Sequence, residues 1–321
     1  MITYVVRRLL YSIPVLVASS FLIFSLVSLS SDPLAPLRSN PNFSPQSIPT
    51  LTAHYQLNKP IPVRYVYWLK DFVLHKGGNS LLTNHPIWPD IQRVMGHTAQ
   101  LVLISQLIAI LLGVAIGVYS AVRQYSVFDY TFTTFSFIGF ALPTFLLALL
   151  LQIAFTNVYL HWHVRIFYTS GLNSPGEGTW SVDRLQHLAL PIVTLVVVSF
   201  ALYSRFMRAS MLEAINSDYA RTARAKGVPE WRVVTRHVMR NALIPLVTVI
   251  ALNVGAILGG AIVTETVFSL DGMGFYFLDR LNHTDLYAVM GWLMLSSIFV
   301  ILFNLIADVL YGYLDPRIRY T

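Results

Sequence analysis

The chain has 321 residues, of which 55% are hydrophobic and only 12% are charged. A soluble domain averages about a quarter charged residues, so a water-soluble fold of this size is excluded because it could not bury so much apolar surface. The net charge of +7 could suggest nucleic acid, but the basic residues lie in short segments between apolar ones, which indicates a bilayer as the partner instead. With no cysteine, disulfide frameworks and thiolate metal sites are also excluded.

Six stretches without charged residues or histidine are long enough, or nearly so, to cross a bilayer, which takes about 20 apolar residues. They cover residues 9–31, 98–122, 130–160, 188–204, 241–264 and 286–307. We therefore predict an all-α membrane protein with six transmembrane helices. The first stretch follows Arg7 and Arg8 as in a signal peptide, but it is too long for one and lacks a clear cleavage site. The fourth can span only if a flanking residue such as Arg205 lies near an interface.

Charge asymmetry predicts the orientation. If the N-terminus lies inside, segments 1–8, 123–129, 205–240 and 312–321 hold 13 Lys and Arg against 5 Asp and Glu, whereas the outer segments hold 9 of each. Short basic loops are retained on the cytoplasmic side, so both termini are predicted to be cytoplasmic. The predicted organisation is an N-terminal end and first span (1–31), a large extracytoplasmic segment (32–97), a core transmembrane domain (98–311) and a cytoplasmic tail (312–321).

The extracytoplasmic segment 32–97 is rich in proline in its first half, and residues 63–74 form an amphipathic pattern typical of a short interfacial helix. This helix could anchor the chain at the interface or contact an external partner. We expect the second outer segment, 161–187, to be mostly loop and the third, 265–285, to be rich in turns. His161 and His163 could bind a metal, but two histidines do not complete a usual site, and an interfacial position is the commoner role.

Polar and small residues inside the spans are candidates for a translocation pathway. Prolines 14, 143, 191 and 245 are expected to kink or break their helices. In the fifth span, small residues let another helix or a substrate approach the backbone, and the sequence favours neither role. The strongest polar groups in the spans are Gln106, Gln152, Asn157 and Asn253. The candidate pathway residues are Asn253, Gly255, Gly259, Gly260, Gln152 and Pro143.

The loop 205–240 is basic and amphipathic, and Gly227 and Pro229 interrupt it. Residues 211–226 are predicted to form a helix, with Gly227 in the left-handed position just past its end. Pro229 and Glu230 suit the first turn of a second helix. The cations Arg221, Arg224 and Lys226 near the end of the first helix could contact anionic lipid or dock onto a cytoplasmic partner.

This loop, read as Asp-Tyr-Ala-Arg-Thr-Ala-Arg-Ala-Lys-Gly over 218–227 and Arg-His-Val-Met-Arg-Asn-Ala-Leu-Ile-Pro over 236–245, resembles that of dipeptide and oligopeptide ABC importer permeases. Further resemblance lies in residues 5–10, 57–65, 142–145, 265–269 and 313–317, so it covers nearly the whole chain. ABC importers generally carry Glu-Ala-Ala-x-x-x-Gly here, of which only Ala223 and Gly227 match. The resemblance implies that Asp218, Tyr219, Arg221, Ala223, Arg224 and Lys226 couple to an ATPase, with Gly227 setting the turn.

By this resemblance the chain is a permease subunit of a bacterial plasma-membrane importer for peptides. Its partners would be a second, similar permease, two cytoplasmic ATPase subunits that bind ATP and Mg, and an extracytoplasmic substrate-binding protein. The sequence has no phosphate-binding loop and no hydrolase motif, so we expect a non-catalytic subunit without a cofactor of its own. Nickel chelates, haem or another small solute are alternative cargoes. A self-sufficient channel or secondary carrier is the alternative from another class, although the spans lack the ionisable residues that ion coupling uses, with Asp308 at the end of the last one.

Overall fold

The computed structural model describes residues 2–30, 32, 34–38, 46–54, 56–74, 78–80, 83, 85–178 and 181–314. The described part is helical, apart from turns and one isolated bridge between Asn79 and Pro86. Most of the predicted tail 312–321, including residues 315–317 of the quoted motifs, lies outside the described residues, as do parts of segment 32–97.

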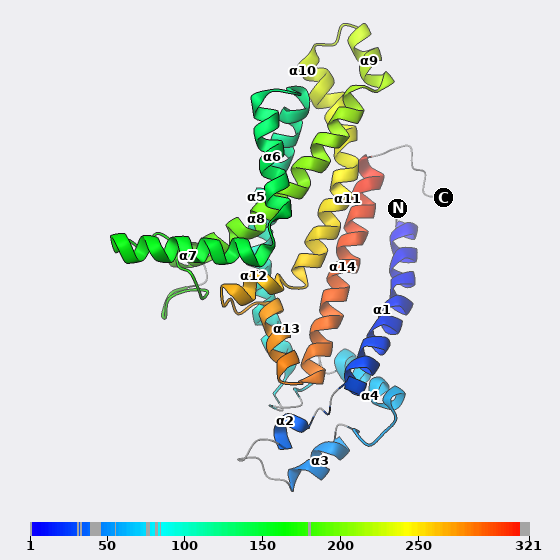
Figure 1. Cartoon of the computed structure of the whole chain (residues 1–321). Coiled ribbons are helices and arrows are strands. Elements are labelled where there is room, and N and C mark those ends of the chain that lie inside the picture. The colour runs from blue at the N-terminus through cyan, green and yellow to red at the C-terminus, as the bar shows by residue number, and fades with distance from the viewer. Residues whose placement is uncertain are drawn as a thin grey trace.

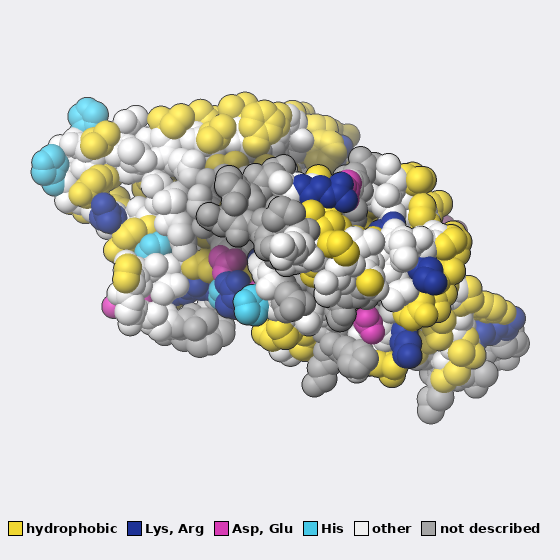
Figure 2. Space-filling view, turned by 90° about the horizontal axis from the view of Figure 1, so that it is seen from below, with side chains coloured by type: hydrophobic (Ala, Val, Ile, Leu, Met, Phe, Trp, Pro, Cys, Tyr) yellow, Lys and Arg dark blue, Asp and Glu magenta, His cyan; other side chains and the backbone are white. Residues whose placement is uncertain are grey.

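Long helices form an elongated bundle (Figure 1). Its centre consists of α5 (Ile87–Val122), α8 (Val182–Ile215), α11 (Met239–Leu258) and α14 (Leu286–Leu314), and α1 (Ile2–Ser30) packs beside α14. Seen from the end that carries the short helices α2–α4, apolar side chains dominate the flanks, and charged ones are scattered over the end surface (Figure 2). We call this the α4 end and the opposite one the α9 end.

The prediction of six spans is confirmed by length and composition, because six described helices are long and apolar enough to cross a membrane. The fourth is much longer than its apolar stretch, since α8 continues as a helix through Arg205 and Arg208. It packs closely on α5, where a Cβ added to Gly113 would lie 2.7 Å from the Tyr203 Cβ. Gly117 meets Met207 in the same way, so two glycines allow the two longest helices to touch.

The third predicted span, 130–160, is not one helix. It divides at Leu142 and Pro143 into α6 (Val127–Ala141) and α7 (Thr144–Trp162). Leu142 is extended, as a residue before proline prefers, and Pro143 is the N-cap of α7. Helix α6 runs beside α5 and α8, whereas α7 projects sideways from the bundle (Figure 1). Proline therefore ends a helix here, although the apolar sequence continues through it.

The fifth predicted span, 241–264, is wrong beyond Leu258. The π-helix η1 (Val233–Val238) leads into α11, which ends at Leu258 with Gly259 as its C-cap, and α12 (Ile262–Val267) follows. Gly260 has φ +142°, and a Cβ there would lie 2.6 Å from the Gly274 backbone nitrogen. Only glycine fits a turn with both features, so the helix breaks where the apolar run does not.

The loops differ in how well they were predicted. Helix α4 (Ile61–Leu74) confirms the amphipathic helix, with Tyr65 and Trp68 buried against Phe24 of α1. The proline-rich region before it contains α2 (Ala35–Arg38) and α3 (Ser47–His54). In segment 161–187, the described residues 163–178 are non-helical as expected. Segment 265–285 instead contains α13 (Met273–Asn282), whose buried residues pack against α5 and α14.

Candidate functional site

The loop at the α9 end consists of two short helices that project beyond the bundle (Figure 1). Helix α8 ends at Ile215, and α9 covers Asp218–Ala225, so the predicted single helix 211–226 is wrong at residues 216–217. Ser217 causes the break: its backbone is extended, with φ −71° and ψ 157°, and its hydroxyl donates to the Ala214 carbonyl at 2.6 Å. Serine side chains that bond to nearby backbone groups in this way favour a helix end over a continuous helix.

Gly227 closes α9 as predicted. It has φ +76°, and its N–H donates to the Arg224 carbonyl at 2.9 Å. The next N–H, of Val228, donates to the Ala223 carbonyl at 3.2 Å. These two bonds form a Schellman motif, which satisfies the free carbonyls of the last turn and reverses the chain. Pro229 then is the N-cap of α10 (Glu230–Arg232), confirming the predicted helix, turn and helix.

Arg224 holds the loop together. Its guanidinium donates to both Glu230 carboxylate oxygens, at 3.0 and 2.8 Å, and to the Ile215 carbonyl at 3.1 Å. One side chain therefore joins the end of α8, the end of α9 and the start of α10. The hydrogen bonds to Glu230 raise the pKa of Arg224 above its usual value, so the charge is fixed at any physiological pH.

The faces of α9 differ in character. Ala220 and Ala223 point inward and are buried with Met211, Val233 and Val238. Of the residues predicted to couple to an ATPase, Asp218, Tyr219, Arg221, Lys226 and Gly227 are exposed, whereas Ala223 packs inward and Arg224 braces the loop. The arrangement presents a small, internally braced surface that carries charge and one aromatic ring.

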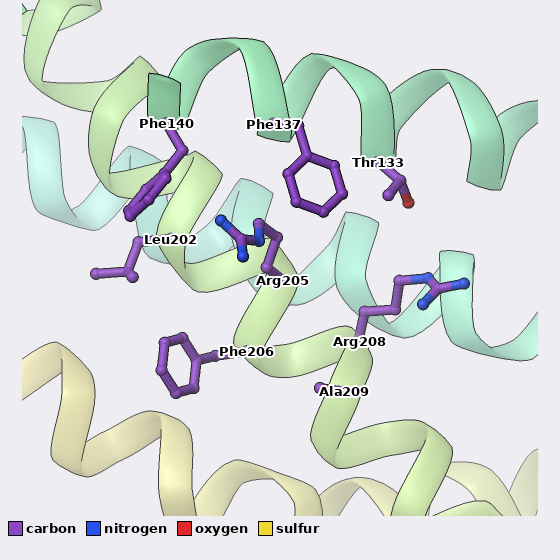
Figure 3. Close-up of a pocket in the computed structure, with 8 residues that line it drawn as sticks. All are labelled: Thr133, Phe137, Phe140, Leu202, Arg205, Phe206, Arg208 and Ala209. Atoms are coloured by element: carbon purple, nitrogen blue, oxygen red, sulfur yellow. The ribbon is translucent and has the colours of Figure 1, made fainter. Parts of the chain in front are cut away.

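Two cavities lie along one side of α8. The first, of about 390 Å³, is between α6 and the α9-end half of α8 (Figure 3). The second, of about 400 Å³, is lined by residues of α8, α11, α12 and the α6–α7 break. Phe140 and Leu202 line both cavities, so the two are adjacent along α8. We call this combined feature the α8 groove.

A hydrogen-bonded cluster of polar side chains lies beside the second cavity. Gln106 donates to Ser199 at 2.9 Å, Tyr203 donates to Gln106 at 2.6 Å, and Asn253 donates to Tyr203 at 2.7 Å. The cluster joins α5, α8 and α11, and all its members except Asn253 are buried. Because Ser199 and Asn253 also line the cavity, the cluster gives an otherwise apolar groove one polar wall.

The predicted pathway residues separate into groups. Asn253 and Gly260 line the α8 groove. Gly255 and Gly259 instead face α14, where an added Cβ would lie 3.0 Å from the Cβ atoms of Phe303 and Ser296, respectively. Those two glycines thus serve helix packing.

The last two predicted pathway residues belong to the α7 region. Gln152 donates to the Thr169 and Val267 carbonyls, at 2.7 and 2.9 Å, and so holds α7 against α12. Pro143 marks the start of α7. At the far end of the same helix, His161 is hydrogen-bonded to the Asn157 carbonyl at 2.9 Å, and no group of three or more potential metal ligands occurs in the described part of the chain.

Sequence reasoning missed a buried carboxylate at Glu265, which was read as the start of an outer loop. Its oxygens accept hydrogen bonds from the Thr98 hydroxyl at 2.7 Å and from the backbone N–H groups of Gly274 and Phe275 at 2.6 and 3.2 Å. A carboxylate at a helix N-terminus is favoured by the helix dipole and by the free N–H groups there. Gly272 leaves room for it, because an added Cβ would lie 2.4 Å from the carboxyl carbon. The feature of the sequence that could have indicated this site is Gly272, which lies seven residues after Glu265.

Comparison with known proteins places this geometry in context. Residues 113–320 match the family described as binding-protein-dependent transport system inner membrane component. The chain is 36% identical over 336 residues to a dipeptide transport system permease protein, DppB, of Alkalihalophilus pseudofirmus, covering both proteins completely. It is 37% identical over 322 residues to the oligopeptide transport system permease protein AppB of Bacillus subtilis, again over all of both chains.

More distant proteins share the architecture. DppB of Escherichia coli is 32% identical over 340 residues, with 100% of this chain and 99% of the relative covered. Among solved structures, an amino acid ABC transporter crystallised with histidines matches with a TM-score of 0.50 at 13% identity, over 72% of this chain and 94% of that one. At that identity the likeness concerns the fold alone.

Proposed function

Since the chain belongs to the family of binding-protein-dependent transport system inner membrane components, we propose that it forms the translocation pathway of an ATP-driven peptide importer. As a family member with six apolar helices, it is a multi-pass protein of the bacterial plasma membrane and a subunit of a transporter complex. The observation that carries the peptide assignment is full-length similarity, at 36 and 37% identity, to permeases named for dipeptides and oligopeptides.

The braced loop supports the second element of the proposal, which is coupling to a partner ATPase. The α9 end then faces the cytoplasm, and the exposed residues Asp218, Tyr219, Arg221 and Lys226 contact the ATPase. Movement of the ATPase reaches the bundle because Arg224 and the buried alanines join α9 to α8. The complete assembly has a second permease, two ATPases that bind ATP and Mg, and an extracytoplasmic binding protein.

The α8 groove supports the third element, the route of the cargo. It is roomy, lies beside a polar cluster in the middle of the bundle, and passes the helix break at Gly260. A pathway for peptides needs hydrogen-bonding groups for amides as well as space for unlike side chains, since buried polar groups without partners are costly. Polar and apolar walls together meet both needs.

Reconstitution tests the proposal. The chain, its partner permease, the ATPases and the binding protein are placed in proteoliposomes, and uptake of a labelled dipeptide is measured with and without ATP. We expect uptake that requires ATP and every subunit. Comparable uptake by this chain alone would identify a channel or secondary carrier and refute coupling. Uptake of a nickel chelate or haem in place of the dipeptide would refute the assigned cargo.

A further inference from the structure

The first cavity of the α8 groove carries two arginines in very different settings (Figure 3). Arg208 is paired with Asp129, donating to its two oxygens at 2.7 and 2.8 Å. Asp129 is itself buried and also accepts from the Tyr125 N–H and the Thr133 hydroxyl, so its acceptor positions are occupied. The charge of Arg208 is therefore already neutralised within the chain.

Arg205 has no such partner. No hydrogen bond or ion pair joins its guanidinium to another group in the described residues. It lies instead between two aromatic rings of α6, 4.5 Å from the Phe137 centroid and 4.9 Å from the Phe140 centroid. Cation–π contacts orient a guanidinium but leave its N–H donors unpaired. An anion that enters the cavity would be bound by those donors in charge-assisted hydrogen bonds.

The orientation of Arg205 argues against a simple interfacial role. It lies ten residues before the end of α8, which is roughly 15 Å from that end along the helix at 1.5 Å per residue. Its side chain points toward Phe137 and Phe140 across the cavity, and not along α8 toward the α9 end (Figure 3). A snorkelling arginine extends toward the interface, so this orientation is that of a residue serving the groove.

The groove also has a length that suits a short peptide. Ser199, at the polar cluster, is six residues from Arg205 on the same helix, or roughly 9 Å along its axis. Extended peptide spans at most about 3.5 Å per residue, so two or three residues bridge this separation. At the cluster, the Asn253 side-chain oxygen is an acceptor available for an amine, because its hydrogen bonds use the nitrogen as donor.

We propose, on the basis of the proposed function, that Arg205 binds the C-terminal carboxylate of the peptide as it passes through the α8 groove. The carboxylate is the one anionic group that peptides of every sequence share, which makes it a suitable group for a carrier of unlike side chains to recognise. Phe137 and Phe140 hold the guanidinium in place, and Asp129 keeps Arg208 from competing. The peptide enters with its amine toward Asn253 and its carboxylate toward the α9 end.

The test compares a dipeptide with its C-terminal amide in the complete reconstituted transporter. ATP-driven uptake of Ala-Ala and of Ala-Ala amide is measured, and the ratio of their rates is compared between variants. Since every variant is supplied by the same binding protein, the preference of that protein cancels. We expect Arg205→Gln to lower the acid-to-amide ratio about tenfold, which corresponds to the loss of one hydrogen bond to a charged group. Arg205→Lys should lower the ratio less. Arg123→Gln, which removes an exposed charge from the nearby α5–α6 loop, should leave the ratio unchanged.

Four results would overturn the inference. An unchanged ratio in Arg205→Gln would show that the carboxylate is not bound there. An equal loss of both peptides would assign Arg205 to the fold, and an equal loss confined to vesicles containing phosphatidylglycerol would assign it to a lipid phosphate. Absence of uptake of either peptide by the unmodified transporter would refute the proposed function, and with it the inference.

Discussion

Replacing Glu265 with alanine should loosen the first turn of α13. All four N–H groups of that turn are satisfied: Met273 donates to Thr98 at 2.7 Å, Gly274 and Phe275 donate to Glu265, and Tyr276 donates to the Gly272 carbonyl at 2.9 Å. Alanine leaves the two middle groups without an acceptor. The Thr98 hydroxyl loses its acceptor as well, but it can turn to the carbonyl one helical turn earlier.

The size of the effect follows from those two N–H groups. A buried donor left unpaired costs about 1–3 kcal/mol, so local opening of the turn should become easier by about 2–6 kcal/mol. Glu265→Gln is the matched control. Its amide oxygen can take the place of the oxygen that accepts from Gly274 and Phe275, while its nitrogen donates to Thr98. We therefore expect a loss below about 1.5 kcal/mol for this variant, chiefly from the missing charge at the helix N-terminus.

Hydrogen exchange measured by mass spectrometry on the protein in nanodiscs reports this opening. At 1.4 kcal/mol for each factor of ten, the amides of residues 273–276 should exchange at least about 30-fold faster in Glu265→Ala and less than about tenfold faster in Glu265→Gln. The exchange rates of amides in α9 should be unchanged in both variants. Equal exchange in the alanine variant and the unmodified chain would refute the role of the carboxylate, and equal acceleration in both variants would show that charge alone matters.

Three further changes test the loop and the packing of α11. Gly227→Val should uncouple ATP hydrolysis from uptake, because a β-branched residue is strained at φ +76°, although nothing lies within 4 Å of an added Cβ. Retained coupling in this variant would contradict the proposed role of the turn. A double-mutant cycle of thermal stability with Arg224→Gln and Glu230→Gln should give a coupling energy below about 1 kcal/mol, because the ion pair is partly exposed. Strictly additive effects would show that the two side chains do not interact. Gly255→Leu should lower the melting temperature by forcing α11 away from Phe303, whereas an unchanged value would place that glycine at a lipid-facing surface.

Much of the fold could be predicted from local properties of the sequence. Hydropathy suffices for α1, α5, α8 and α14, since a bilayer selects apolar length directly. The turn at Gly227 was also predictable, because a Schellman motif uses only residues within six positions of one another. What these features share is that each depends on neighbours along the chain.

The misplaced features depend on residues far apart. The break at Gly260 exists because its backbone meets that of Gly274, and an apolar run gives no sign of that contact. Glu265 is buried because Thr98, 167 positions away, and the start of α13 form a site for its carboxylate. A hydropathy pattern instead predicts that an acidic residue such as Glu265 lies in water. The direction of α7 after Pro143 likewise depends on where Gln152 finds its carbonyl partners.

The unbroken course of α8 has a mechanical consequence for the transporter. Between Ile215, where Arg224 fastens the loop, and Ser199, at the polar cluster, the helix contains neither proline nor glycine over roughly 24 Å. Its one proline, Pro191, lies beyond Ser199. This part of α8 therefore acts as a stiff rod, so that a tilt imposed at the loop arrives at Arg205, Tyr203 and Ser199 without being absorbed on the way. The same helix would then both transmit the movement of the loop and contact the cargo.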